Sequence, residues 1–281
     1  MAKKSTAKKD SGLSRNAIER IVVAAILVPL VIVVVFFIKK PVVVGCILAV
    51  VAALAAFEFA RMSPMKSNMN LVYGFSALTG LFPIVVAQAG RDYLSLFMVV
   101  AVLVAMAAPM AFDEDIKKRF DKMLWFVLGV CYIGLLTSHF QMLWGLKGGR
   151  HMLMLVCVMV WVNDIGAYVA GSNFGKNKMT PELSPKKTYE GLLGGAAAAV
   201  GSAFIYAHFH KFPVLDTGKM FILAFAVVVA ATIGDLFESF IKRYAGVKDS
   251  GTLLKGHGGV LDRIDSLIFA VPVAYYVIRY L

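Results

Sequence analysis

The sequence predicts an all-α, polytopic integral membrane protein with about nine transmembrane helices and a cytoplasmic N-terminus. The 281 residues are 59% hydrophobic and only 16% charged, far from the usual composition of a soluble domain. The apolar residues form runs of about 20, the length at which an α-helix crosses roughly 30 Å of hydrocarbon. The 29 lysines and arginines are divided unevenly between alternate loops, as expected for a chain with a fixed orientation in the bilayer.

The elements follow from these runs in chain order. Residues 1–20 form a polar, basic tail. Helices and closed barrels are the only structures that satisfy the backbone in lipid, so we expect helices at 21–38, 41–60, 71–89, 93–112, 123–146, 152–174, 191–209, 220–241 and 260–281. The first five runs form an N-terminal group, 21–150. The last four form a C-terminal group, 151–281, with the polar loops 175–190 and 243–259.

The distribution of basic residues predicts the orientation. With nine spans, the side of the N-terminal tail holds 21 lysines and arginines, and the other side holds eight. Because cytoplasmic loops carry the excess of basic residues, we expect the tail and both polar loops on the cytoplasmic side of the cell inner membrane. The net charge of +12 could indicate nucleic acid, but no basic domain exists. Anionic lipids and phosphate compounds are the expected partners, and no nucleic acid is expected.

One carboxylate lies within a predicted span. Asp164 shares a helix face with Tyr168 and Gly171, four and seven residues later. An unpaired carboxylate at this depth costs about 3 kcal/mol on insertion scales, so Asp164 should face the bundle and have a partner. It is either a substrate-binding residue or a structural polar contact between helices.

The loop before the run 191–209 carries the sequence SPKKTYEG, residues 184–191. Basic groups beside a helix N-terminus form an anion site, although the positive-inside bias alone would also supply two lysines. The candidate phosphate-binding residues here are Ser184, Lys186, Lys187 and Thr188.

The stretch 234–266 is unusually polar for this chain. The run 220–241 and the residue after it place four polar side chains on one helix face, namely Asp235, Glu238, Ser239 and Lys242. Asp262 and Asp265 are spaced i, i+3 at the start of the last helix, where the helix dipole favours negative charge. If the two faces meet, the carboxylates repel one another unless cations neutralise them.

Two interpretations of this acidic group remain open from the residues alone. Oxygen ligands without cysteine indicate a Mg²⁺ or Mn²⁺ site. Alternatively, the carboxylates form a lattice of ion pairs with the basic residues Lys242, Arg243, Lys248 and Arg263. Between them, Gly256, Gly258 and Gly259 allow the backbone to wrap a small ligand, and His257 is either part of that site or a structural hydrogen-bonding residue.

The string SFIKRYAGVKDSGTLLKGHGGVLDRIDS, residues 239–266, closely resembles the signature of the phosphatidate cytidylyltransferase family, also called CDP-diacylglycerol synthases. It contains the S-x-x-K-R, K-D and H-G-G-x-x-D-R-x-D elements at the family's spacing. The strings GDLFES, SPKKTYEG and WVNDIGAY extend the resemblance over the C-terminal half, whereas the first five runs match only in hydropathy. One departure is Lys255, where the family usually has proline.

The resemblance implies transfer of a cytidylyl group from CTP to phosphatidate, giving CDP-diacylglycerol and pyrophosphate, in phospholipid biosynthesis. It also implies a Mg²⁺ centre on Asp235 and Asp262, with a second cation as an option, and a homodimer. The predicted catalytic residues are Asp235, Lys242, Asp249, Asp262 and Asp265. The predicted substrate-binding residues are Ser184, Lys186, Lys187, Thr188, Ser239, Arg243, Lys248, Gly256, His257, Gly258, Gly259, Arg263 and Asp164.

The main alternative is a multi-pass transporter with a cytoplasmic-side cation site. A transporter would place its charged groups near the bilayer midplane, between inverted repeats, whereas the acidic faces here lie at helix ends and the two halves show no repeat. A CDP-alcohol phosphatidyltransferase would carry the string D-G-x-x-A-R, which is absent. A non-catalytic lipid-binding scaffold gives no reason for so many carboxylates.

Overall fold

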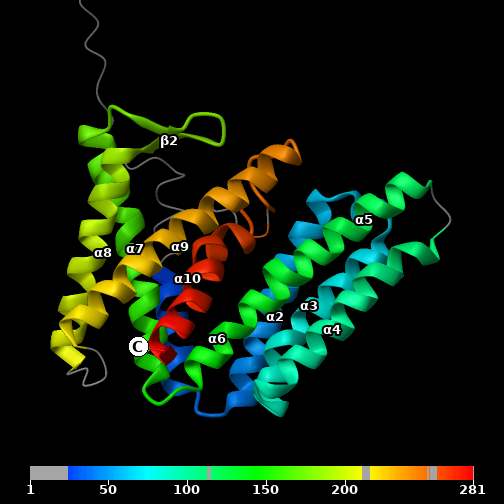
Figure 1. Cartoon of the computed structure of the whole chain (residues 1–281), viewed down its shortest axis with the longest axis horizontal. Helices are drawn as coiled ribbons and strands as arrows, with labels where there is room; N and C mark the ends of the chain where they lie inside the picture. Colours follow the sequence, from blue (N-terminus) through cyan, green and yellow to red (C-terminus); the bar gives the residue numbers. More distant parts are fainter. Residues whose placement is uncertain (1–24, 113–114, 211–215, 252, 254–257, 281) are drawn as a thin grey trace, which may run out of the picture.

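A computed structural model describes residues 25–112, 115–210, 216–251, 253 and 258–280. The described chain is almost entirely helical (Figure 1). Its main helices are α2 (Pro41–Met62), α3 (Met69–Ala89), α4 (Asp92–Ala107), α5 (Ile116–Gly129), α6 (Leu136–Trp144), α7 (Gly149–Phe174), α8 (Tyr189–His210), α9 (Thr217–Tyr244) and α10 (Leu261–Tyr280). The predicted basic tail lies outside the described residues.

Within the residues that the structure describes, seven helical segments are long and apolar enough to cross a membrane, and each coincides with a predicted span. They are Pro41–Met62, Met69–Ala89, Asp92–Ala111, Ile116–Trp144, Gly149–Phe174, Tyr189–His210 and Thr217–Tyr244. The other two predicted spans are also helical where the structure describes them. Ala25–Phe37 is shorter, and α10 carries charged residues near both ends. The protein is therefore a polytopic, all-α membrane protein, as predicted, while the count of nine crossings stays a prediction.

Local chemistry explains where several helices begin and bend. The side chains of Asn68 and Asp216 accept the backbone N–H of residues three positions later, at 3.2 and 2.9 Å, which caps α3 and α9. Between α5 and α6 the chain forms a π-helical turn, Val130–Leu135, within one long apolar segment. Such a turn lets a helix bend without ending.

The buried side chains form two apolar clusters on either side of α10. One cluster joins α7, α8, α9 and the inner face of α10. The other joins α2, α3, α4 and α5 and is rich in aromatic rings, including Phe59, Phe75 and Phe126. Figure 1 shows α7 to α9 on one side of the molecule, α3 to α5 on the other, and α10 between them. The last helix therefore contacts both halves of the chain.

The pair formed by α7 and α8 is packed most closely. Gly195 lies so near α7 that a Cβ atom there would be 2.7 Å from the Asn163 carbonyl oxygen. Gly191, Gly195 and Ala199 are all buried on this face of α8. This spacing of small residues lets two helix backbones approach each other in a membrane.

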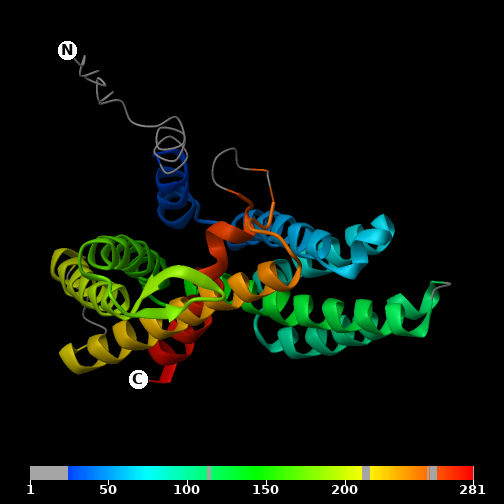
Figure 2. The same cartoon turned by 90° about the horizontal axis from the view of Figure 1, so that it is seen from above.

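A two-stranded hairpin interrupts the helical fold in the loop 175–190. Strand β1 (Lys178–Thr180) pairs antiparallel with β2 (Ser184–Thr188), a feature that the sequence does not predict. Glu190 closes its base by accepting hydrogen bonds from the Asn177 backbone N–H at 3.2 Å and side-chain amide at 2.8 Å. Figure 2 shows the hairpin at the end of α7 and α8, reaching over α9.

Candidate active site

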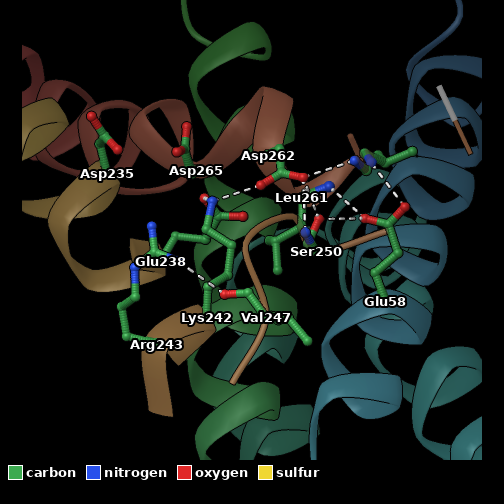
Figure 3. Close-up of polar contacts among 12 residues, drawn as sticks. Glu58, Asp235, Glu238, Lys242, Arg243, Val247, Ser250, Leu261, Asp262 and Asp265 are labelled. Carbon is green, nitrogen blue, oxygen red and sulfur yellow. Dashed lines mark hydrogen bonds and ion pairs between the residues drawn. The ribbon is translucent and has the colours of Figure 1, made fainter. Parts of the chain in front are cut away.

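The C-terminal end of α9, which precedes the loop 245–260, and the start of α10, which follows it, bring the predicted acidic residues together (Figure 3). Lys242 of α9 lies at the centre of this group. Its ammonium donates to Glu238 Oε2 at 2.5 Å and to Asp262 Oδ1 at 2.6 Å. Glu238 is fully buried, and the Lys242 side chain is 12% exposed. One lysine therefore bridges two carboxylates from two helices, so the interpretation as an ion-pair lattice describes this part of the site.

The second oxygen of Asp262 fixes both ends of the glycine-rich loop. Asp262 Oδ2 accepts the backbone N–H of Ser250 at 2.9 Å, the Ser250 hydroxyl at 2.9 Å and the backbone N–H of Gly259 at 2.8 Å. Gly258 has a φ of +78°, and its missing Cβ leaves room for the Asp262 carboxylate. Asp262 thus has a full set of hydrogen-bond donors.

Asp235 is held differently. Its carboxylate forms an ion pair with Lys187 of β2, and the two side chains are 35% and 24% exposed. The structure therefore brings the SPKKTYEG loop and the polar stretch 234–266 into direct contact. In Figure 3 the Asp265 side chain lies between Asp235 and Asp262.

A pocket of about 280 Å³ opens beside the Lys187–Asp235 pair. Its wall includes Asp164 and Asn163 of α7, Lys186 and Lys187 of β2, and Asp235 of α9, together with Ser266 of α10. Asp164 is exposed on this wall, which favours the substrate-binding interpretation over a structural contact between helices. Opposite charges on one concave wall suit a ligand that carries both phosphates and bound cations.

Thr188 also borders the pocket but is buried, and its hydroxyl accepts the Gly191 backbone N–H at 3.1 Å. It caps α8. Lys186 is exposed, whereas the Lys187 side chain is half-buried and its ammonium nitrogen has essentially no exposed surface. Ser184 and Ser239 are half-buried.

Three further predicted site residues, one catalytic and two phosphate-binding, lie at the surface. Lys248, Asp249 and Arg263 are exposed. Arg243 donates to the Leu183 carbonyl oxygen at 3.4 Å and to the Val247 carbonyl oxygen at 3.2 Å, so it ties the hairpin turn to the loop after α9.

The backbone of residues 256–259 is predicted to cradle an anion. In the structure the Gly259 N–H donates to the Asp262 carboxylate instead of facing an anion site. This hydrogen bond fixes the position of Gly259. Gly256, His257 and Lys255 lie outside the described residues, and their predicted roles stay predictions.

The acidic side chains of the site are of the type that binds a divalent cation, but they are not arranged as a metal-binding site. Five carboxylates, of Asp164, Asp235, Glu238, Asp262 and Asp265, share this region with Lys187 and Lys242. The buried Glu238 Oε1 has no hydrogen-bond partner within the described residues, and acidic oxygens in surplus suit Mg²⁺. Among the residues that the structure describes, however, no three acidic, histidine or cysteine side chains are grouped for metal binding.

One further acidic residue of this region was not predicted. Glu58 lies near the end of α2, in the apolar string AAFEFA, and its carboxylate contacts the first turn of α10. An ionisable residue in a membrane span is a functional candidate by default, so its position was a usable signal. Its partners are about 200 residues away in sequence, and no local pattern indicates them.

Comparison with known proteins adds a family and close relatives. The model of the cytidylyltransferase family matches residues 18–281. The phosphatidate cytidylyltransferase of Thermotoga maritima is 30% identical over 273 residues, which cover 93% of this chain and 96% of that protein. The phosphatidate cytidylyltransferase of Pseudomonas aeruginosa is 31% identical over 259 residues, 91% of this chain and 94% of that protein. That of Haemophilus influenzae is 47% identical over 131 residues, 46% of each chain. The similarity therefore includes the first five helices.

Proposed function

This chain belongs to the cytidylyltransferase family, and we propose that the polar site between β2, α9 and α10 is where it acts on its substrates. The protein is a CTP-using nucleotidyltransferase that makes CDP-diacylglycerol from phosphatidate. A phosphate oxygen of phosphatidate forms a bond to the α-phosphorus of CTP. The bond from that phosphorus to the oxygen bridging to the β-phosphorus breaks, and pyrophosphate leaves.

This reaction depends on the positioning of its two substrates more than on a strong general base. The second pKa of a phosphate monoester is about 6, so the nucleophile is already ionised near neutral pH. The obstacle is to bring a lipid dianion and a triphosphate together and to disperse charge onto the leaving pyrophosphate. Fixed cationic groups and a shaped pocket supply both.

The observation that carries the proposal is the Lys187–Asp235 ion pair on the pocket wall. The Lys187 ammonium nitrogen has essentially no exposed surface while it is paired with Asp235, so a substrate phosphate would displace the carboxylate in order to contact it. Lys186 lies next to it on the same wall and adds a second positive charge. Asp235 would then be free to hold the cation that accompanies the triphosphate.

We propose Asp235 and Asp262 as the residues that hold Mg²⁺, with Asp265 between them. When bound, the ion would offset the charge of the triphosphate and stabilise the leaving pyrophosphate. Lys242 keeps Glu238 and Asp262 together on neighbouring helices, which preserves the spacing of the acidic groups before substrate arrives.

The proposed setting is a chain with nine crossings in the cell inner membrane, with its N-terminus and active site in the cytoplasm, acting as a homodimer. The excess of basic residues in the corresponding loops supports this orientation. In Figure 1 the hairpin and the C-terminal end of α9 lie on the same side of the molecule as the α2–α3 and α4–α5 connections, which agrees with one cytoplasmic side.

The test is incorporation of labelled CMP from CTP into lipid by the purified full-length protein in vesicles. We expect labelled CDP-diacylglycerol only when phosphatidate and Mg²⁺ are both present, and complete loss of turnover in excess EDTA that Mg²⁺ restores. Absence of lipid-linked CMP under all conditions would favour transport or binding. Full turnover in EDTA would remove the cation from the proposal while leaving the reaction in place.

A further inference from the structure

Glu58 connects the N-terminal helices to the active site. It lies one turn before the end of α2 and is only 6% exposed, and its partners belong to the loop and helix that carry Asp262. Figure 3 shows its carboxylate facing Ser250 and the start of α10. A buried carboxylate is costly unless its oxygens receive hydrogen bonds, so the contacts of Glu58 explain its place.

Both carboxylate oxygens of Glu58 accept hydrogen bonds. Oε1 accepts the backbone N–H of Val260 at 2.9 Å, and Oε2 accepts the backbone N–H of Leu261 at 2.9 Å. These N–H groups belong to the start of α10, where no partner exists within the helix, and the helix dipole favours a negative charge at that end. Glu58 therefore acts as a capping group supplied by another helix.

The Ser250 hydroxyl links Glu58 to Asp262. Its oxygen lies 3.0 Å from Glu58 Oε2 and 2.9 Å from Asp262 Oδ2. A hydroxyl has one hydrogen to donate, so the two carboxylates share a single donor and are held next to each other. Displacement of Glu58 would change the surroundings of Asp262 directly.

Two glycines make room for this carboxylate. A Cβ atom at Gly251 would lie 2.6 Å from Glu58 Oε1, and a Cβ atom at Gly259 would collide with Glu58 Oε2. The loop is thus shaped around Glu58 on both sides. This fit is independent of the hydrogen bonds and indicates one defined position for the side chain.

We propose that Glu58 is a positioning residue for the cytidylyl transfer. It fixes Ser250 and the first turn of α10, and so sets the place of Asp262 relative to Lys242 and the pocket. This inference rests on the proposed role of Asp262 in the reaction. Glu58 is not among the residues that line the pocket, and it acts through the residues it holds.

The test uses Glu58→Gln and Glu58→Asp in the full-length protein, purified and assayed in phosphatidate vesicles. Glutamine keeps the shape of the Glu58 side chain but turns an NH₂ group toward at least one of the two backbone N–H donors. Aspartate is too short to reach both N–H groups. We expect kcat of the folded fraction to fall about 100-fold, the loss that a misplacement near 1 Å produces. The KM values for CTP and phosphatidate should change little, because substrate contacts remain.

A second measurement reports the position of α10 without relying on turnover. Hydrogen exchange of the amides in 258–266 should become about tenfold faster in Glu58→Gln, because buried acceptors of these N–H groups are lost. Gly251→Ala should lower kcat and speed exchange in the same way, because its new Cβ displaces the unchanged Glu58 side chain. This variant replaces the Glu58 variants in the test if those fold poorly.

The matched control is Thr79→Val in α3, a fully buried residue whose hydroxyl donates to the Phe75 carbonyl oxygen at 2.9 Å. It should lower thermal stability but keep kcat. Wild-type kcat in folded Glu58→Gln, or loss of kcat with unchanged exchange in 258–266, would overturn the proposal. If the wild-type protein makes no CDP-diacylglycerol, the proposed reaction fails, and the exchange data still decide whether Glu58 holds α10.

Discussion

The Lys187–Asp235 pair and the Lys242–Asp262 pair both join a lysine to an aspartate within one site, but the structure holds them very differently. Asp235 interacts with one lysine and is 35% exposed, whereas the Asp262 side chain is 7% exposed and accepts three further hydrogen bonds. The first pair borders the pocket. The second ties two helices and a loop together.

The sequence predicts the same catalytic and metal-binding role for both aspartates, whereas the structure indicates a different role for each. A partly exposed ion pair contributes little to stability and is easily exchanged for a substrate group. Removal of a buried carboxylate that has several donors strongly destabilises the fold, because those donors are left without partners. We infer that Asp235 belongs to the part of the site that rearranges on binding, whereas Asp262 keeps its loop contacts through Oδ2, and only its Oδ1, which is paired with Lys242, would become available to a cation.

Asp262→Asn should have the largest effect. We expect activity to fall at least about 100-fold and the free energy of unfolding to fall by about 3 kcal/mol, because Lys242 and the loop N–H groups lose their charged partner. CDP-diacylglycerol formation and thermal unfolding in the same detergent would be measured together. Unchanged thermal stability would show that the buried pair does not hold the site together, so that Asp262 would not differ from Asp235 in this respect.

Asp235→Asn should lose activity to a similar extent but stay folded. Its ion pair is partly exposed, so the expected change in unfolding free energy is less than about 1 kcal/mol. The same two assays apply, together with the elution profile of the purified protein. Mg²⁺-dependent turnover at the wild-type rate would remove Asp235 from the proposed cation site.

Lys187→Ala should have a smaller effect, an increase in KM for one phosphate-bearing substrate. Loss of one charge-assisted contact to a phosphate corresponds to a change of about 10- to 100-fold. Lys178→Ala is the matched control, since Lys178 is exposed on the partner strand of the same hairpin, and KM there should change less than about twofold. Equal effects in both variants would indicate general attraction of anions instead of a specific contact. Whichever KM rises, that for CTP or that for phosphatidate, identifies the phosphate that Lys187 binds.

Most of the fold could be predicted from hydropathy. The apolar runs locate most described main helices to within a few residues. The exception is the run 123–146, because the helical segment there begins seven residues earlier, at Ile116, and consists of two helices joined by a π-helical turn. The hairpin β1–β2 could not be predicted, because it is short, carries three lysines within its strands and has no alternating apolar pattern. Its pairing depends on Glu190 and Arg243 rather than on a buried face.

The candidate site could be predicted in outline but not in its pairings. Helical spacing placed Asp235 and Lys242 on one face and Asp262 at the start of the last helix, as the structure has them. Spacing along a helix cannot tell which lysine meets which aspartate, since that depends on how α9, α10 and the hairpin cross. Glu58 was missed for the same reason, because its partners come from the other end of the chain.

The contact of Glu58 with Leu261 joins residues 203 positions apart, which has a consequence for the order of synthesis. Chains are made from the N-terminus at about 5–20 residues per second, so α2 exists well before the donors that its carboxylate needs. During that interval the carboxylate needs hydrogen bonds from water or from other donors. The site is completed only when the last helix docks, and a chain that ends before α10 leaves the Glu58 carboxylate without the two backbone donors that it has in the finished protein.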